Sequence, residues 1–167
     1  MVRSKNATIE VIIIVVICIT MLIANVDLKT YSIQESSSLS AMLLYSFIHV
    51  NILHAFMNLS TLLILWYYYY PKAWMVLTSY IIAISYPATL FHTAPTVGLS
   101  GFCYALMALL SIHVLRKRYW HTTICSMILI SFFLPRFNGY IHLYCYAVGM
   151  CVVGILHLLK KMKIKTK

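Results

Sequence analysis

Acidic side chains are nearly missing from this sequence of 167 residues, which holds 3 Asp and Glu against 13 Lys and Arg. The three acids are Glu10, Asp27 and Glu35, all in the first quarter of the chain. A Ser–His–Asp triad requires a carboxylate beside its catalytic histidine. We expect Glu10 on the cytoplasmic side and Asp27 and Glu35 in the first external loop, so a site of that type is not expected.

Charge of either sign is also scarce. Charged residues make up 10% of the chain, hydrophobic residues make up 62%, and the mean hydropathy is +0.88. A soluble domain of this length cannot bury so much apolar surface, so we expect a lipid bilayer to cover it. At about 20 residues for each spanning helix, the chain has room for about six spans in one membrane domain, residues 1–167.

The apolar runs and the polar residues between them predict six helices. They cover residues 7–24, 41–70, 74–90, 100–115, 122–134 and 140–159. The expected fold is an all-α membrane protein, a bundle of six transmembrane helices. The first segment leaves an alternative open, because its apolar stretch Val11–Ala24 is short and follows Arg3 and Lys5, as in a signal peptide.

The basic residues predict the orientation of this bundle. With the N-terminus in the cytoplasm, only Lys29 and Arg136 lie outside, and all the other basic residues lie inside: Arg3, Lys5, Lys72, Arg116, Lys117, Arg118, Lys160, Lys161, Lys163, Lys165 and Lys167. This asymmetry places both termini in the cytoplasm. The net charge of +10 therefore indicates membrane topology and not nucleic-acid binding. With no targeting extension, we expect a bacterial plasma (inner) membrane.

Neither a disulfide nor a metal site is expected. The five cysteines lie inside apolar runs without a CxxC pair, which predicts free, buried thiols: Cys18, Cys103, Cys125, Cys145 and Cys151. A zinc protease needs H-E-x-x-H on one helix face, whereas His49 and His54 are spaced H-x-x-x-x-H with no carboxylate nearby. We expect no metal and no cofactor.

Polar residues from three predicted helices fall at one depth in the membrane. We count the distance of each residue from the nearest cytoplasmic charge along its helix, at roughly 1.5 Å per residue. Ser100 lies about 24 Å from Arg116 and His142 about 27 Å from Lys160. Asn58 and His54 lie about 21 and 27 Å from Lys72. In a hydrocarbon core of about 30 Å, this level is several Å below the outer surface. Intramembrane polar groups are costly and should face a shared cavity.

Two features of the predicted helices lie at this level, a shared helix face and a helix start. His54 and Asn58 are four residues apart and share a face, whereas His49, five residues before His54, should point about 140° away. Ser100 lies between Gly98 and Gly101 at a helix start, where free N–H groups favour a developing negative charge.

The chemistry expected of these residues is acyl transfer. Ser100 would be the nucleophile and His142 the general base, and His54 and Asn58 would add donors to an oxyanion hole. Tyr104, one turn after Ser100, could stack on His142 and orient it without a carboxylate. Taken singly, the features have simpler explanations, since a serine at a helix start is often only an N-cap. We expect His113, His121 and His157 to be structural.

Three motifs occur in order along the chain. They are His49-VNIL-His54-AFM-Asn58, Gly98-Leu99-Ser100-Gly101 followed by FCYALM, and Ile141-His142-LYCYAV-Gly149. Over residues 49–149 they resemble the signatures of the rhomboid family of intramembrane serine proteases. The resemblance implies a six-helix rhomboid-like core whose substrates are transmembrane protein segments, entering sideways and cleaved near their outer end. The motifs carry no information on oligomeric state.

The resemblance also implies the role of each site residue. Ser100 is the nucleophile and His142 is the base, while His54, Asn58 and the backbone N–H groups of Ser100 and Leu99 stabilise the oxyanion. Supporting positions are those that shape the loop or the helix contacts: His49, Gly98, Gly101, Tyr104, Cys145 and Gly149.

Two departures from the family pattern stand out. Cys145 occupies a position where the family commonly has glycine. We therefore expect the fourth and sixth predicted helices to lie slightly further apart, and the hydrogen bond of the dyad, Ser100 and His142, to be looser. The first external loop, Asn25–Ser40, is short and lacks a Trp-Arg pair. Phe132, Phe133 and Phe137 lie where a substrate gate is expected.

Two other functions stay open from the sequence. A catalytically inactive rhomboid-like protein would bind or escort transmembrane segments, although it would not need both Ser100 and His142. A small transporter or channel would use the same polar cavity, with His54 and His142 relaying protons. The lack of internal repeats and of paired intramembrane acids argues against transport.

Overall fold

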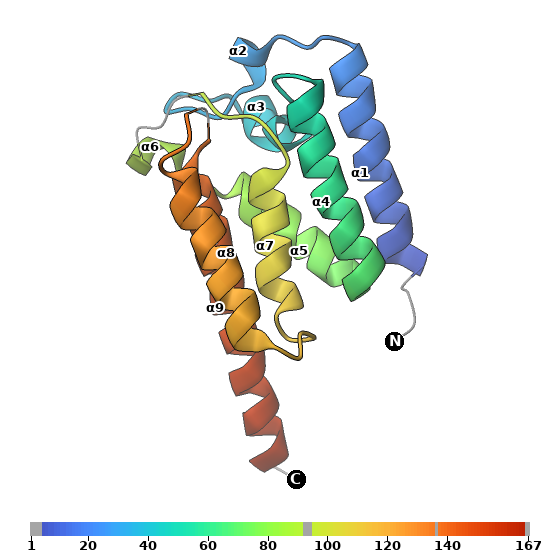
Figure 1. Cartoon of the computed structure of the whole chain (residues 1–167), viewed down its shortest axis with the longest axis vertical. Coiled ribbons are helices and arrows are strands. Elements are labelled where there is room, and N and C mark those ends of the chain that lie inside the picture. Colours follow the sequence, from blue (N-terminus) through green and yellow to red (C-terminus); the bar gives the residue numbers. More distant parts are fainter. Residues whose placement is uncertain (1–4, 92–94, 136, 166–167) are drawn as a thin grey trace.

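The computed structural model describes residues 5–91, 95–135 and 137–165, and helices dominate these ranges (Figure 1). In chain order the elements are α1 (Lys5–Ile23), α2 (Leu28–Tyr31), α3 (Leu39–Leu44), η1 (Tyr45–Phe47), α4 (Ile52–Tyr69), α5 (Ala73–Ile84), α6 (Ala88–Phe91), α7 (Ser100–Leu110), α8 (Lys117–Ser131) and α9 (Gly139–Lys165). Extended pairing within these ranges is limited to one isolated bridge between Ile33 and Thr96. The all-α prediction is confirmed.

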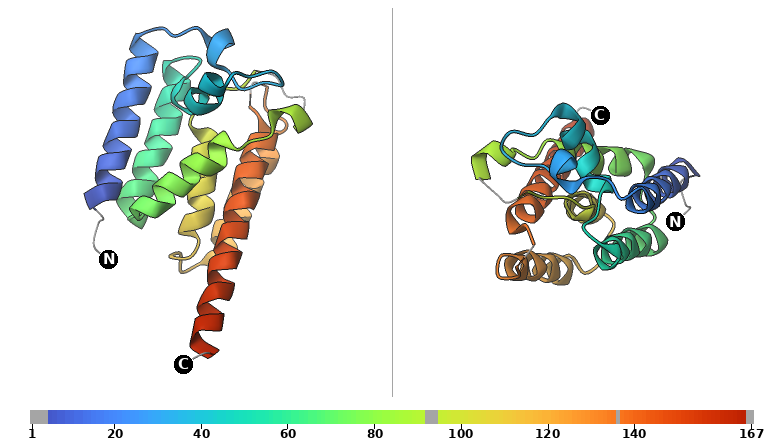
Figure 2. Two further views of the ribbon diagram at one scale, coloured as in Figure 1. Left: turned by 180° about the vertical axis from the view of Figure 1, so that it is seen from behind. Right: turned by 90° about the horizontal axis from the view of Figure 1, so that it is seen from above.

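Helix α7 is the centre of the bundle, as the view from above shows (Figure 2). Every residue from Gly101 to Leu110 is buried, so this helix has no exposed face. Helix α9 packs most extensively against it, and α5 and α4 cover other sides. Helix α1 packs outside α4 and α5, whereas α8 packs mainly against α9. A helix that is apolar all round is expected to lie in the core.

Two helices are long and apolar enough to cross a membrane, namely Lys5–Ile23 and Gly139–Lys163. The pair Leu39–Phe47 and Ile52–Tyr69, bent by 79°, would provide a third span. Ala73–Ile84 and Ser100–Leu110 are apolar but have only 12 and 11 residues, fewer than the roughly 20 that a straight crossing requires. By length and composition, the described residues thus provide two or three candidate spans, and six are not confirmed.

The helix predicted over 41–70 is broken in the structure. After η1, Ile48 is extended, and α4 begins only at Ile52. The cause is Asn51, which is extended and accepts a hydrogen bond from the backbone N–H of His54 at 2.9 Å. Asparagine at this position caps a new helix instead of continuing the previous one.

The helix predicted over 74–90 is also interrupted, because α5 ends at Ile84 and α6 begins at Ala88. Pro87 lies between them, and proline lacks an N–H and disfavours helical geometry in the residue before it. Helix α7 ends at Leu110 instead of residue 115, so it is only about 16 Å long. The depth of 24 Å counted from Arg116 assumed an unbroken helix, which the structure does not have between Leu110 and Arg116.

The start of α1 and the end of α9 lie at one end of the bundle, together with the α4–α5 and α7–α8 turns (Figure 1). The basic residues Lys72 and Arg116 belong to these turns, and Lys117 begins α8. Lys29 lies in α2 at the opposite end, which we call the α2 end. There Ile33 and Thr96 exchange backbone hydrogen bonds of 2.9 and 3.0 Å, which tie the first loop to the segment before α7.

The thiols are all free, as predicted, but only some of them are buried. Cys18, Cys103 and Cys145 are buried, whereas Cys125 and Cys151 are exposed. These two lie on faces of α8 and α9 that no other helix covers, so their placement in an apolar run did not ensure burial.

Candidate active site

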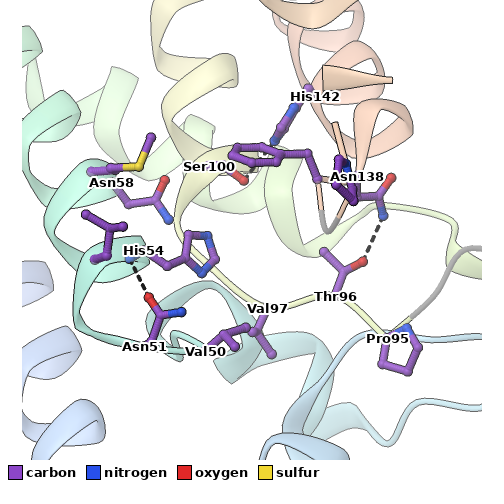
Figure 3. Close-up of a pocket in the computed structure, with 14 residues that line it drawn as sticks. Val50, Asn51, His54, Asn58, Pro95, Thr96, Val97, Ser100, Asn138 and His142 are labelled. Carbon is purple, nitrogen blue, oxygen red and sulfur yellow. Dashed lines mark hydrogen bonds between the residues drawn. The ribbon is translucent and has the colours of Figure 1, made fainter. Parts of the chain in front are cut away.

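Ser100 and His142 meet at the α2 end of the bundle (Figure 3). Ser100 is the first residue of α7, and His142 lies in the first turn of α9. The Oγ atom of Ser100 is 3.0 Å from Nε2 of His142. The N-cap of α7 is Leu99, and it makes no side-chain capping bond. The Ser100 hydroxyl is therefore directed at the imidazole and does not serve as a helix cap.

The other ring nitrogen of His142 is also occupied. Its Nδ1 atom is 3.1 Å from the Oγ atom of Ser131, a buried residue at the end of α8. The Ser131 hydroxyl in turn donates to the backbone carbonyl of Ile128 at 2.6 Å. Sequence reasoning missed Ser131, because a single serine in an apolar helix carries no motif.

Tyr104 stacks on His142, as the sequence predicted. Their ring centroids are 4.4 Å apart and their planes differ by 26°. Tyr104 lies one turn after Ser100 on α7, so the residues that contact the imidazole come from two other helices, α7 and α8. His142 itself is only 3% exposed. The imidazole of His142 is thus held in its plane by two hydrogen bonds and on one face by the ring of Tyr104.

His54 and Asn58 share a face of α4, as predicted, and both also reach the loop before Ser100. A Cβ atom on Gly98 would lie 2.7 Å from Cε1 of His54 and 3.2 Å from Nδ2 of Asn58. Gly98 has a φ of +120°, and its N–H donates to the carbonyl of Tyr45 at 2.9 Å. Only glycine allows the loop to pass this close to α4 in this conformation.

Asn58 has an unused hydrogen-bond donor at this position. Its Nδ2 atom is buried and makes no hydrogen bond to any described residue. Buried polar atoms are normally satisfied, and exceptions often belong to functional sites. The amide can therefore bind an oxygen atom that enters the cavity.

The prediction for His49 is wrong. We expected it to point about 140° away from His54, but the two rings are 5.2 Å apart in an edge-to-face arrangement. The angular argument assumed one continuous helix, whereas His49 lies in the extended segment between η1 and α4. His49 is buried and supports His54 from the side.

The expected loosening at Cys145 is also wrong. The dyad distance is an ordinary 3.0 Å. The Cys145 side chain is fully buried against Gly101, where an added Cβ would lie 3.2 Å from the sulfur. Further along, a Cβ on Gly149 would lie 2.7 Å from Cβ of Ala108. Glycine on one helix thus faces a larger group on the other, which keeps α7 and α9 close.

A cavity of about 270 Å³ opens beside the dyad. Figure 3 shows His54 and Asn58 on one side of it and Ser100 with His142 on the other. Its lining also includes Val50, Asn51, Leu53, Met57, Pro95, Thr96, Val97, Pro135, Phe137 and Asn138. At its rim Asn138 donates to Thr96 Oγ1 at 2.8 Å, which joins the loop before α9 to the loop before α7.

Of the three phenylalanines expected at a gate, the cavity lining includes Phe137. Phe132 packs edge-to-face on Tyr140 with ring centroids 5.0 Å apart, and Phe133 is 80% exposed. His92, whose role the sequence left open, and Arg136 lie outside the described residues.

Comparison of the chain with protein-family models, with curated proteins and with solved structures finds no match. The site assignment therefore depends on the geometry of these residues and on their motifs.

Proposed function

We propose that this chain is an intramembrane serine endopeptidase, which cleaves transmembrane segments of other membrane proteins. The observation that carries the proposal is the 3.0 Å contact between Ser100 Oγ and His142 Nε2 at the edge of a cavity. A nucleophile and a base within hydrogen-bond reach, with the base oriented by other groups, is the signature of nucleophilic catalysis.

The reaction follows from the position of each group. His142 Nε2 accepts the hydroxyl proton as Ser100 Oγ attacks the scissile carbonyl, and it then gives that proton to the leaving amine. The oxyanion would bind to free N–H groups at the start of α7, with further donors from His54 and Asn58. Water entering the cavity would then release the acyl group, with His142 again acting as base.

The proposed arrangement in the membrane keeps the six-span topology with both termini in the cytoplasm, in a bacterial plasma membrane. The short helix α7 would be enclosed by its neighbours, and both α5 and α7 would reach the interface through their connecting loops. The α2 end, with the cavity, would face outward. The dyad would then lie near the outer surface, and cleavage would occur near the outer end of a substrate helix.

The space between α4 and α8 supports sideways entry of a substrate. Besides the cavity at the dyad, a second cavity of about 450 Å³ lies nearer the opposite end, and its lining includes Thr61 and Leu65 of α4 and Trp120 and Ile124 of α8. The two helices are thus separated by open space along part of their length, while the rings of Tyr69 on α4 and Trp120 on α8 are in contact, with centroids 4.9 Å apart. A substrate helix could approach Ser100 through this gap without unfolding the bundle.

Fluorophosphonate labelling of the purified protein, combined with cleavage of a tethered transmembrane reporter, tests the proposal. We expect wild type to be labelled and to cut the reporter, and Ser100→Ala to lose both signals. Ser111→Ala is the matched control, because Ser111 is a buried serine at the opposite end of α7. Reporter binding without labelling or cleavage would support the inactive, helix-binding alternative and overturn the protease proposal.

A further inference from the structure

The hydrogen bonds around Ser131 define which nitrogen of His142 carries the proton. A serine hydroxyl has one proton to donate, and Ser131 directs it to the carbonyl of Ile128 at 2.6 Å. The Ser131 oxygen can therefore only accept at its 3.1 Å contact with His142 Nδ1. The Nδ1 atom must be the donor, so the neutral ring carries its proton there.

This tautomer is the one that the proposed chemistry requires. With the proton on Nδ1, the Nε2 atom has a free lone pair directed at the Ser100 hydroxyl 3.0 Å away. With the proton on Nε2, the ring could not accept the serine proton, and Nδ1 and Ser131 would face each other without a proton to share. Burial of Ser131 and His142, both 3% exposed, limits replacement by water.

We propose that Ser131 is a positioning residue that holds His142 in the Nδ1–H tautomer, in the role that a carboxylate has in a Ser–His–Asp triad. The catalytic meaning of this inference rests on the proposed protease function, but the tautomer does not. Since Ser131 ends α8, the inference also connects the placement of α8 to the protonation of the base.

The tautomer can be measured directly by ¹⁵N NMR on protein with labelled histidines, at a pH where the rings are neutral. The two ring nitrogens differ in chemical shift according to which one is protonated, and His142→Ala identifies the signals of His142 by their loss. We expect wild-type His142 to be protonated on Nδ1. Protonation of His142 on Nε2 in the wild-type protein would overturn the inference without any variant at position 131.

Variants at position 131 test whether Ser131 is responsible for the tautomer of His142. Ser131→Ala should shift His142 to a mixture of tautomers, whereas Ser131→Thr, which keeps the hydroxyl, should restore Nδ1 protonation. Ser79→Ala is the matched control, because Ser79 is also a buried helical serine bonded to a carbonyl one turn earlier, here that of Met75 at 2.7 Å. An unchanged tautomer in folded Ser131→Ala would contradict the assigned role.

Reporter kinetics add a second readout. Ser131→Ala should lower kcat about 10-fold, which corresponds to the loss of one net hydrogen bond, and should leave KM unchanged. A rise in KM alone would instead indicate a structural role and overturn the inference. If wild type neither labels nor cleaves but its tautomer still depends on Ser131, the proposed function fails and this inference stands.

Discussion

Among single residues, His142 is the most constrained side chain of the site. Ser100 and Ser131 occupy its two nitrogens, and the ring of Tyr104 lies 4.4 Å from its own ring, centroid to centroid. The three partners come from two other helices, α7 and α8. A buried imidazole held in this way has little freedom to rotate away from Ser100.

For the positioning of His142, the aromatic ring of Tyr104 should be more important than its hydroxyl. Tyr104→Phe keeps the aromatic face and should label with fluorophosphonate within about 3-fold of the wild-type rate. Tyr104→Leu removes the stacking, worth about 0.5–1.5 kcal/mol, and should slow labelling by up to about 10-fold. Equal labelling rates for the two variants would show that the stack does not position His142.

Gly98 should tolerate no side chain. In Gly98→Ala, the φ of +120° becomes strained by about 1–3 kcal/mol, and the new Cβ would lie within 2.9 Å of two His54 ring atoms. The ring must shift, which displaces a proposed oxyanion donor. We expect more than 10-fold slower labelling, after correction for the folded fraction, and a lower unfolding temperature in detergent. A variant with wild-type labelling would exclude this account of the loop.

The sequence was sufficient to predict most of the site's contacts. Spacing placed His54 and Asn58 on one face and Tyr104 one turn from Ser100, because both helices continue across those residues. It failed for His49, whose relation to His54 depends on a break in the chain. It could not predict Ser131, because which buried serine meets Nδ1 is decided by the packing of α8 on α9.

Among the elements, the contact between α7 and α9 determines the dyad distance. Each helix contributes a glycine where the other has a larger group, Gly101 against Cys145 and Gly149 against Ala108. Neither pairing can be read from the sequence alone. The register of the two helices places Cys145 opposite a glycine, and for this reason the thiol does not separate them.

Gly149→Ala should destabilise this contact. The added Cβ would lie 2.7 Å from Cβ of Ala108 and 3.1 Å from the carbonyl oxygen of Ala105, and overpacking of this kind costs about 1–3 kcal/mol. Thermal unfolding in detergent should show a lower midpoint, partly restored by adding Ala108→Gly.

Gly154→Ala is the matched control, because nothing lies within 4 Å of a Cβ at that position of the same helix. Its midpoint should be unchanged or slightly higher, since alanine favours helix over glycine. Equal destabilisation by both variants would mean that the close approach at Gly149 is not important.

Helix boundaries were the least predictable feature at this scale. Hydropathy marked the apolar stretch 41–70 as one helix, yet the side chain of Asn51 begins a new helix at Ile52. Likewise Pro87 divides 74–90, although its neighbours are apolar. Apolar composition reports the surroundings of a segment, whereas local hydrogen bonds decide where its helix starts and stops.

For the whole molecule, the distribution of basic residues is the feature that bears on topology. Lys72 and Arg116 lie at the same end as the start of α1 and the end of α9, and Lys29 lies at the other. The sequence predicted this division from charge alone. The number of spans, in contrast, depends on how short helices such as α7 are enclosed, which hydropathy does not describe.

Single-cysteine labelling can test the topology. In a background with Cys125 and Cys151 replaced by serine, an impermeant maleimide should label Lys29→Cys in intact cells. Lys72→Cys and Lys160→Cys should react only after the membrane is opened, because the proposal places both inside. Labelling of Lys72→Cys in intact cells would contradict the six-span arrangement.

The shielding of α7 has a consequence for how the proposed protease would respond to the thickness of its lipid bilayer. This helix is about half as long as a hydrocarbon core is thick, and its residues from Gly101 onward are covered by neighbouring helices. A change in acyl-chain length would therefore act on the outer helices and on the substrate, while Ser100 kept its place within the bundle. The same substrate helix would then be cut at different positions in thin and thick bilayers. The distance between the two cuts would measure how far the substrate helix shifts along the bundle when the bilayer thickness changes.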